Sequence, residues 1–173
     1  RGVATNSTLT ELDLRRNDLR AEGVAILVRE CLNRKKNRNR SLRVLDLSDN
    51  AIGEEGVRSL APFIRDHRNK LLQTIHLNKN RLGGGGFKTL MDAIAFNPYV
   101  TKLGLARNEL GVEGARYLAT KLRDPAGKVN VCWLDLSNNK LCGISNRAQQ
   151  DEYDPSGILD IARVLKGVPA KVC

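Results

Sequence analysis

The chain has 173 residues, of which 29 are Lys or Arg and 19 are Asp or Glu, so its formal net charge is +10 at pH 7. This length predicts a single domain, and because no apolar run reaches 18 residues we expect no membrane-spanning helix. The four cysteines show neither a CxxC nor a His-paired spacing, so we expect no metal site and no cofactor.

One short pattern recurs five times along the chain. Its copies are LDLRRNDLR (12–20), LDLSDNAIG (45–53), IHLNKNRLG (75–83), LGLARNELG (103–111) and LDLSNNKLC (134–142). Aligning the copies places an asparagine in one column, at intervals of 33, 30, 28 and 31 residues: Asn17, Asn50, Asn80, Asn108 and Asn139. A recurrence of this period indicates a repeat architecture.

Each copy begins with alternating apolar residues, which predicts a strand of about three residues. One more apolar residue precedes each strand: Leu9, Leu42, Leu72, Val100 and Val131. After the strand the chain must bend, and its backbone groups there need partners. An asparagine side chain carries both donors and an acceptor, so we expect the asparagine column to satisfy these groups from one unit to the next.

A helical segment follows each bend. In the first four units we expect it to begin six residues after the asparagine, at Gly23, Gly56, Gly86 and Gly114. The apolar residues that follow at helical spacing are Leu27 and Cys31, Leu60 and Ile64, Leu90 and Ile94, and Leu118 and Leu122. In the fifth unit, residues 142–156 are inserted and we expect the helix to begin at Gly157. One unit cannot bury its apolar face alone, but a stack of units forms a continuous core.

These units resemble leucine-rich repeats of the ribonuclease-inhibitor type, written L-x-x-L-x-L-x-x-N-x-L-G and followed by a helix. The resemblance covers residues 9–167, with flanks at 1–8 and 168–173. It implies a curved α/β solenoid with a parallel sheet on the concave face and helices on the convex face. Members include inhibitors, the sensor regions of nucleotide-binding immune receptors and the Ran GTPase-activating protein, so the fold alone does not define the function.

The residues between the inward leucines are expected to face outward from the concave side of the sheet. Trp133 is the only tryptophan, and tryptophan is enriched among binding hot spots. The alternative for Trp133 is that it covers the open end of the stack. The alternative for His76 is that it is an ordinary surface histidine. The candidate protein-binding residues are Trp133, Lys102, His76, Asp46, Asp135, Asp13, Arg107 and Tyr153.

The densest basic run lies at residues 33–43, between the first helix and the second strand. Its cationic residues are Arg34, Lys35, Lys36, Arg38, Arg40 and Arg43. Such a cluster fits nucleic acid phosphates or an acidic protein, and the alternative is a solvated insertion. The segment GGGGFKTL (83–90) lacks the spacing of a phosphate-binding loop, so we interpret its glycines as structural.

No set of nucleophile, base and orienting group stands out, so the sequence favours a non-catalytic scaffold that binds a protein partner rather than a small-molecule substrate or a membrane. Nucleic-acid attachment through residues 33–43 is one alternative. A GTPase activator that uses Arg20 or Arg81 is another. We expect four unpaired thiols, and hence a cytoplasmic or nuclear location. The chain begins at Arg1, so we expect a piece of a longer protein, with neighbouring sequence or a partner covering at least one end of the stack.

Overall fold

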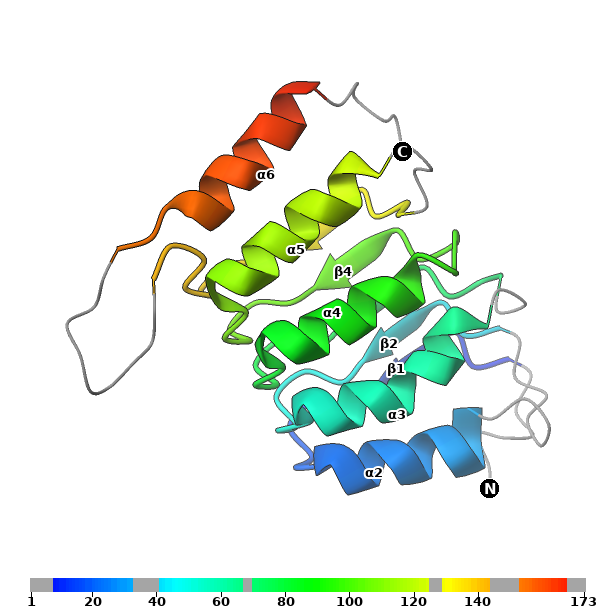
Figure 1. Cartoon of the computed structure of the whole chain (residues 1–173). Coiled ribbons are helices and arrows are strands. Elements are labelled where there is room, and N and C mark those ends of the chain that lie inside the picture. Colours follow the sequence, from blue (N-terminus) through cyan, green and yellow to red (C-terminus); the bar gives the residue numbers. More distant parts are fainter. Residues whose placement is uncertain (1–7, 33–40, 67–69, 125–128, 144–152, 168–173) are drawn as a thin grey trace.

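The computed structural model describes residues 8–32, 41–66, 70–124, 129–143 and 153–167 (Figure 1). Five strands alternate with helices along the chain. In order they are β1 (Glu11–Asp13), α2 (Arg20–Leu27) continued by the π-helical turn η1 (Val28–Leu32), β2 (Val44–Asp46), α3 (Gly53–Arg65), β3 (Thr74–His76), α4 (Gly83–Ile94), β4 (Lys102–Gly104), α5 (Gly111–Arg123), β5 (Trp133–Asp135) and α6 (Ser156–Gly167).

The strands form one parallel sheet in chain order. Their first residues pair in one row, namely Glu11, Val44, Thr74, Lys102 and Trp133, which confirms the register expected from the repeats. Figure 1 shows the helices side by side on one face of this sheet. Neighbouring strands are about 4.8 Å apart, whereas packed helices need about 8–10 Å. The stack therefore bends with the sheet on its inner side, as the solenoid prediction requires.

The core lies between the sheet and the helices. The central strand residues Leu45, Ile75 and Leu103 are fully buried, whereas the equivalent residues of the terminal units, Leu12 and Leu134, are only half-buried. This difference arises because an internal unit has a neighbour on both sides and a terminal unit has one. None of the helices in the described part of the chain is both long and apolar enough to cross a membrane.

The helices begin earlier than expected. Helices α3, α4 and α5 begin three residues after the asparagine, at glycines with φ of 63°, 63° and 64°, so the predicted starts at Gly56, Gly86 and Gly114 are wrong by about one turn. A residue with a left-handed backbone conformation at this point turns the chain directly from the bend into the helix. The later glycines serve close packing instead: a Cβ at Gly86 would lie 3.3 Å from the Cα of Glu54 in α3.

The first and fifth units depart from this pattern. Helix α2 begins at Arg20, three residues before the predicted Gly23, and Arg20 has φ of 53° without being glycine. Cys31 lies in the π-helical turn after α2. Helix α6 begins at Ser156, one residue before the expected Gly157. A Cβ at Gly157 would lie 2.6 Å from the Cβ of Ala115, so this glycine lets α6 pack closely on α5.

The expectation of four unpaired thiols is wrong. Cys132 is disulfide-bonded, whereas Cys31 and Cys142 take no part in a disulfide. Disulfide formation depends on which Cβ atoms meet in the fold rather than on spacing along the chain, so no feature of the repeat pattern indicated this bond.

Candidate functional site

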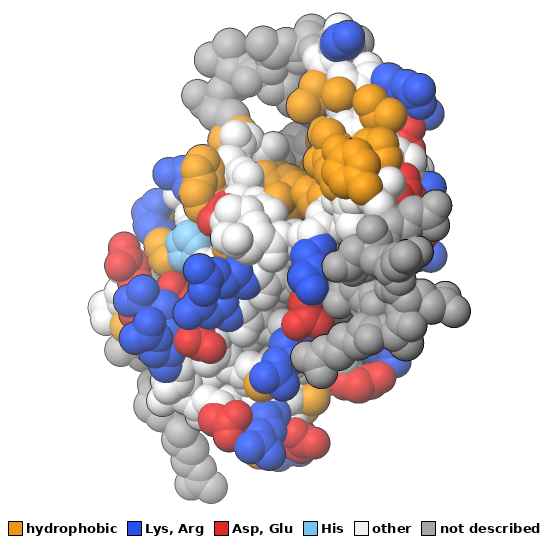
Figure 2. All heavy atoms as spheres, turned by 90° about the vertical axis from the view of Figure 1, so that its left-hand side faces the viewer, with side chains coloured by type: hydrophobic (Ala, Val, Ile, Leu, Met, Phe, Trp, Pro, Cys, Tyr) orange, Lys and Arg blue, Asp and Glu red, His pale blue; other side chains and the backbone are white. Residues whose placement is uncertain are grey.

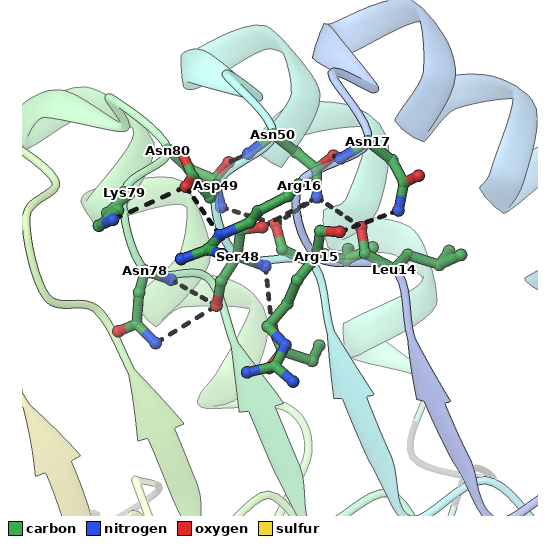
Figure 3. Close-up of polar contacts among 12 residues, drawn as sticks. Leu14, Arg15, Arg16, Asn17, Ser48, Asp49, Asn50, Asn78, Lys79 and Asn80 are labelled. Carbon is green, nitrogen blue, oxygen red and sulfur yellow. Dashed lines mark hydrogen bonds and ion pairs between the residues drawn. The ribbon is translucent and has the colours of Figure 1, made fainter.

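A ladder of asparagine side chains holds the strand-to-helix bends in place (Figure 3). The backbone N–H of Asn50 donates to Oδ1 of Asn80 at 2.9 Å, and the N–H of Asn80 donates to Oδ1 of Asn108 at 2.8 Å. The Nδ2 of Asn80 donates back to the carbonyl of Leu47 at 2.9 Å. The same arrangement joins Asn17 to Asn50 and Asn108 to Asn139. This ladder confirms the role expected for the asparagine column, and it fixes the strands that carry the candidate site.

Two rings meet on the exposed face of the sheet. His76 of β3 and Trp133 of β5 lie with their ring centroids 6.2 Å apart and their planes at 82°, an edge-on contact. Trp133 is 47% exposed. We call His76 and Trp133 the aromatic pair. Trp133 leans over β4 toward His76, away from the open end beyond β5.

A glycine on the intervening strand makes this contact possible. Gly104 of β4 pairs in register with His76 on one side and Asp135 on the other. A Cβ at Gly104 would lie 2.6 Å from Nδ1 of His76 and 3.1 Å from the side chain of Asn78. Any side chain here would therefore displace the histidine. The repeat pattern did not indicate this effect of Gly104 on the neighbouring strands.

The first half of the same face is a network of ion pairs. Arg15 contacts Asp13 at 2.7 Å and Asp46 of the next strand at 3.4 Å. Hydrogen bonds from the Arg15 side chain and backbone lower the pKa of Asp13. Asp49 lies 3.6 Å from Arg16 and 3.7 Å from Lys79. Figure 2 shows acidic and basic side chains interleaved over these units. Two of the predicted binding residues, Asp13 and Asp46, are thus partnered within the chain.

The remaining predicted residues are spread over the surface. Lys102 is exposed and pairs in register with Trp133, while Asp135 accepts a hydrogen bond from the N–H of Ser137 at 2.9 Å. Arg107 is exposed at a bend. Tyr153 is exposed and bridges to Gly143. No ring contact among the described residues joins Tyr153 to Trp133, so Tyr153 is not part of the aromatic pair.

The basic segment falls almost wholly outside the described residues. Arg34, Lys35, Lys36, Arg38 and Arg40 lie there, and only Arg43 is described, where it is exposed just before β2. Within the described part of the chain, no group of three or more His, Cys, Asp or Glu residues is arranged to hold a metal ion.

A second polar cluster, which the sequence pattern did not indicate, joins α4 to α5. Asp92 accepts hydrogen bonds from the Tyr117 hydroxyl and from Lys121, whose Nζ lies 2.6 Å away. Burial alone would raise the pKa of Asp92, but the hydrogen bonds from Lys121 and Tyr117 outweigh burial, so its pKa is lowered. Lys88 and Lys121 lie 5.6 and 5.3 Å from the centroid of the Tyr117 ring. This cluster ties two helices together on the helical side of the stack.

Known proteins share both the sequence pattern and the fold. A family model described as "Leucine Rich repeat" matches residues 5–27, 38–61 and 96–119. NACHT, LRR and PYD domains-containing protein 12 of Mus musculus is 31% identical over 86% of this chain. NACHT, LRR and PYD domains-containing protein 3 of Rattus norvegicus is 30% identical over 82% of this chain. The chain spans 16% of the length of each of these two relatives.

Solved structures agree at the level of the fold. The chain superposes on "Leiomodin-1 Actin-Binding Site 2" with a TM-score of 0.64 and 14% identity, covering 93% of this chain and 81% of that one. It superposes on the tropomodulin C-terminal domain of Caenorhabditis elegans with a TM-score of 0.63 and 12% identity, covering 93% and 84%. The five stacked units and these matches together show that the chain is a leucine-rich repeat protein, with units compatible with the ribonuclease-inhibitor type.

Proposed function

We propose that the chain is a non-catalytic scaffold that binds a protein partner on the exposed face of its sheet. The observation that carries this proposal is the aromatic pair: an exposed tryptophan held edge-on to a histidine over a glycine gap. Tryptophan supplies large contact area at low entropic cost, and such residues dominate interface energies. The histidine contact limits the freedom of the indole before binding, which reduces the entropy lost on association.

The charges around the aromatic pair suggest what the partner presents. Arg15 already neutralises Asp13 and Asp46 in the first half of the face. Lys102 is exposed beside Trp133. An apolar or aromatic side chain against Trp133, flanked by a carboxylate near Lys102, matches this arrangement.

The curated relatives support a role within a larger polypeptide. They are named for NACHT and PYD domains as well as for leucine-rich repeats, and the chain corresponds to only part of their length. We therefore propose that the chain acts as the repeat region of such a protein. Actin binding, for which the leiomodin fragment is named, is not carried over because that likeness is at 14% identity and concerns the fold.

The test is a pull-down from native lysate with the native chain, Trp133→Ala and a matched control. Phe96→Ala is the control, since Phe96 is a similarly exposed aromatic residue at 53%, located after α4 and stacked with Arg65 instead of lying on the sheet face. We expect Trp133→Ala to lose the retained proteins and Phe96→Ala to keep them, with or without nuclease. Equal retention by Trp133→Ala and the native chain would contradict the proposed face.

A second candidate function is nucleic-acid attachment through residues 33–43, favoured by the net charge of +10. It predicts that binding falls steeply with salt, and that replacing the Lys and Arg residues of this segment reduces the slope. Retention that collapses on nuclease treatment would favour this candidate over the sheet face. For a GTPase activator, the side chain of Arg20 would first have to leave Asp18, which it contacts at 2.8 Å; a single-turnover GTPase assay without acceleration would exclude that role.

A further inference from the structure

A polar hollow adjoins the aromatic pair on the sheet face. It has a volume of about 720 Å³ and is formed by residues of β1, β2 and β3 and of the bends that follow these strands. Every side chain that lines it is polar or charged, and one of them is His76, which also contacts Trp133. The hollow and the aromatic pair are therefore parts of one continuous surface.

The strand side of the hollow carries a small excess of negative charge. The Arg15 guanidinium donates hydrogen bonds to both carboxylate oxygens of Asp13, the shortest at 2.7 Å. Nε of Arg15 also lies 3.4 Å from Oδ2 of Asp46 on the next strand. Two carboxylates thus share one guanidinium, so an acidic group of a partner would be repelled on this side.

The bend side of the hollow carries the opposite excess. Nε of Arg16 lies 3.6 Å and Nζ of Lys79 lies 3.7 Å from the same oxygen, Oδ2 of Asp49. Figure 3 shows both side chains beside this carboxylate. Both distances are longer than a hydrogen bond, and two cations share one acid. The two cationic groups therefore keep donors for a further acceptor.

The positive excess continues along one row of bend residues. Arg16, Asp49, Lys79 and Arg107 follow the strands of four successive units and have the same left-handed backbone conformation, with φ between 55° and 59°. We call these four residues the cationic row, since three cations and one acid give it a net charge of +2. Arg107 is exposed, and within the described part of the chain it forms no ion pair. Figure 2 shows Lys and Arg side chains gathered beside the histidine of the sheet face.

The spacing of the cationic row suits an extended peptide that crosses the strands. Neighbouring strands are about 4.8 Å apart, so Arg16 and Lys79 are separated by roughly 10 Å along the row, and Arg107 follows roughly 5 Å further on. An extended peptide advances about 3.3 Å per residue. A segment of about five residues therefore covers the whole row.

The distribution of charge favours an acidic peptide over a nucleic acid. A nucleic acid strand carries a phosphate at every nucleotide, and some of these phosphates would face Asp13 and Asp46 on the strand side of the hollow. A peptide can place its carboxylates at the row alone. Carboxylates also accept strong charge-assisted hydrogen bonds from Arg and Lys side chains.

We propose that the cationic row binds an extended acidic segment of the protein partner, with its carboxylates beside Arg16, Lys79 and Arg107. This inference rests on the proposed function, because it names the chemistry of a partner that binds the same face. It places the acidic residues of the partner at the carboxyl end of the strands, whereas Lys102 lies at the amino end of β4.

The experiment uses a series of synthetic peptides as probes. Each peptide contains one phenylalanine and three consecutive glutamates, separated by zero to about six glycines, and each has a counterpart with glutamine in place of glutamate. Affinity is measured by calorimetry at about 20 mM salt, where charge interactions are weakly screened. The fluorescence of Trp133, the only tryptophan, reports whether the peptide reaches the aromatic pair. We expect the best glutamate peptide to bind about tenfold more tightly than its glutamine counterpart. No binding, or no preference for glutamate at any spacing, would overturn the proposal.

A double variant then locates the acidic peptide on the surface. Arg16→Gln with Lys79→Gln should weaken binding of the glutamate peptide about fivefold and leave the glutamine peptide unchanged. The control is Arg123→Gln with Lys166→Gln, which removes the same charge from exposed positions on α5 and α6. This control should bind like the native chain. Equal weakening by the two double variants would show a general charge effect and would contradict the proposal.

Trp133→Ala separates this inference from the proposed function. If Trp133→Ala weakens both kinds of peptide while the Arg16→Gln, Lys79→Gln variant binds normally, the cationic row is wrong and the sheet-face function stands. If only the row variant weakens binding, the row is supported and the role of the aromatic pair is contradicted. A single-stranded oligothymidylate of about twelve nucleotides is the last probe. Binding of this probe to the row as tightly as the glutamate peptides would mean that the row recognises phosphate, which overturns the proposal.

Discussion

The middle of the stack and its two ends are built from the same residues in the same positions, yet these residues differ in their surroundings. Leu77 and Asn80 of the third unit are fully buried, whereas Leu14 of the first unit is half-buried and Asn17 is exposed. In a repeat protein each unit contacts only its neighbours, so a unit with one neighbour gains about half of the stabilisation. The contribution of a residue therefore depends on the position of its unit, and residue type alone does not set it.

The largest expected effect concerns the leucine column. Leu77→Ala should lower the free energy of unfolding by about 3 to 4 kcal/mol, because it leaves a cavity between packed neighbours. Leu14→Ala should lower it by about 1 kcal/mol, since water already reaches one side of this residue. Urea unfolding followed by circular dichroism measures both values. Equal losses would contradict the comparison between the middle and the ends.

The next prediction compares an internal asparagine of the ladder with the asparagine of the first unit. Asn80→Ala removes the acceptor for the N–H of Asn50 and a donor to the carbonyl of Leu47. Because these backbone groups are buried, we expect a loss of about 3 kcal/mol. Among the described residues the Asn17 side chain makes one hydrogen bond, to the nearby Arg15 carbonyl, so Asn17→Ala should cost less than about 0.5 kcal/mol. Thermal unfolding of the two variants, compared at one temperature, tests this ranking.

The left-handed residue at the start of α2, α3, α4 and α5 offers a smaller effect. Gly83 has φ of 63° with open space around its Cα, so Gly83→Ala should cost about 1 kcal/mol from backbone strain alone. The first unit already carries Arg20 at this position. Arg20→Gly should change stability by less than about 0.5 kcal/mol, because relief of strain offsets the greater freedom of the unfolded chain. A large loss in Arg20→Gly would instead indicate that its contact with Asp18 is important.

The last prediction concerns charge pairs on the helices. Asp92→Asn should lower stability by about 1 kcal/mol at pH 7, allowing for the partial exposure of Asp92. Because folding lowers the pKa of Asp92, its contribution is fully present above the unfolded pKa of about 3.9 and is lost as the pH falls through the folded pKa. The difference between Asp92→Asn and the native chain should therefore close in acid.

The matched control for Asp92→Asn is an ion pair on α6, the last helix of the stack. Asp160 and Arg163 lie three residues apart in α6 and form an ion pair at 3.3 Å within this one helix. Asp160→Asn should change stability by less than about 0.3 kcal/mol at any pH. Urea unfolding at a series of pH values compares the two variants, and a pH-independent loss in Asp92→Asn would mean that the role of Asp92 is packing and not charge.

Much of the fold follows from the sequence because it depends on periodic residues. The alternating leucines set the strands and the asparagines set the bends, so the row from Glu11 to Trp133 was predicted in its register. The helix starts were predicted one turn late, since glycines three and six residues after the asparagine look alike in a sequence. Only the backbone distinguishes them: Gly83 has a positive φ, and Gly86 packs closely on α3.

The candidate site was less predictable because it depends on side chains that meet across strands about 30 residues apart in the chain. The exposure of Trp133 followed from the alternation, but its contact with His76 required the missing side chain of Gly104. Likewise the contact of Arg15 with Asp46 follows from the orientation of the Arg15 side chain across two strands. Such contacts are set by rotamers and not by spacing.

The close-packing glycines of the helices also influence the shape of the sheet face. Each unit is wider on the helical side than on the strand side, and this difference in width sets the radius of curvature of the stack. Gly86 brings α4 near the backbone of α3 and Gly157 brings α6 near α5. This close packing narrows the units on the helical side and so increases the radius of curvature of the stack. These buried positions on the outer side thus help to set the width of the opening into which a partner must fit, although they touch nothing that enters it.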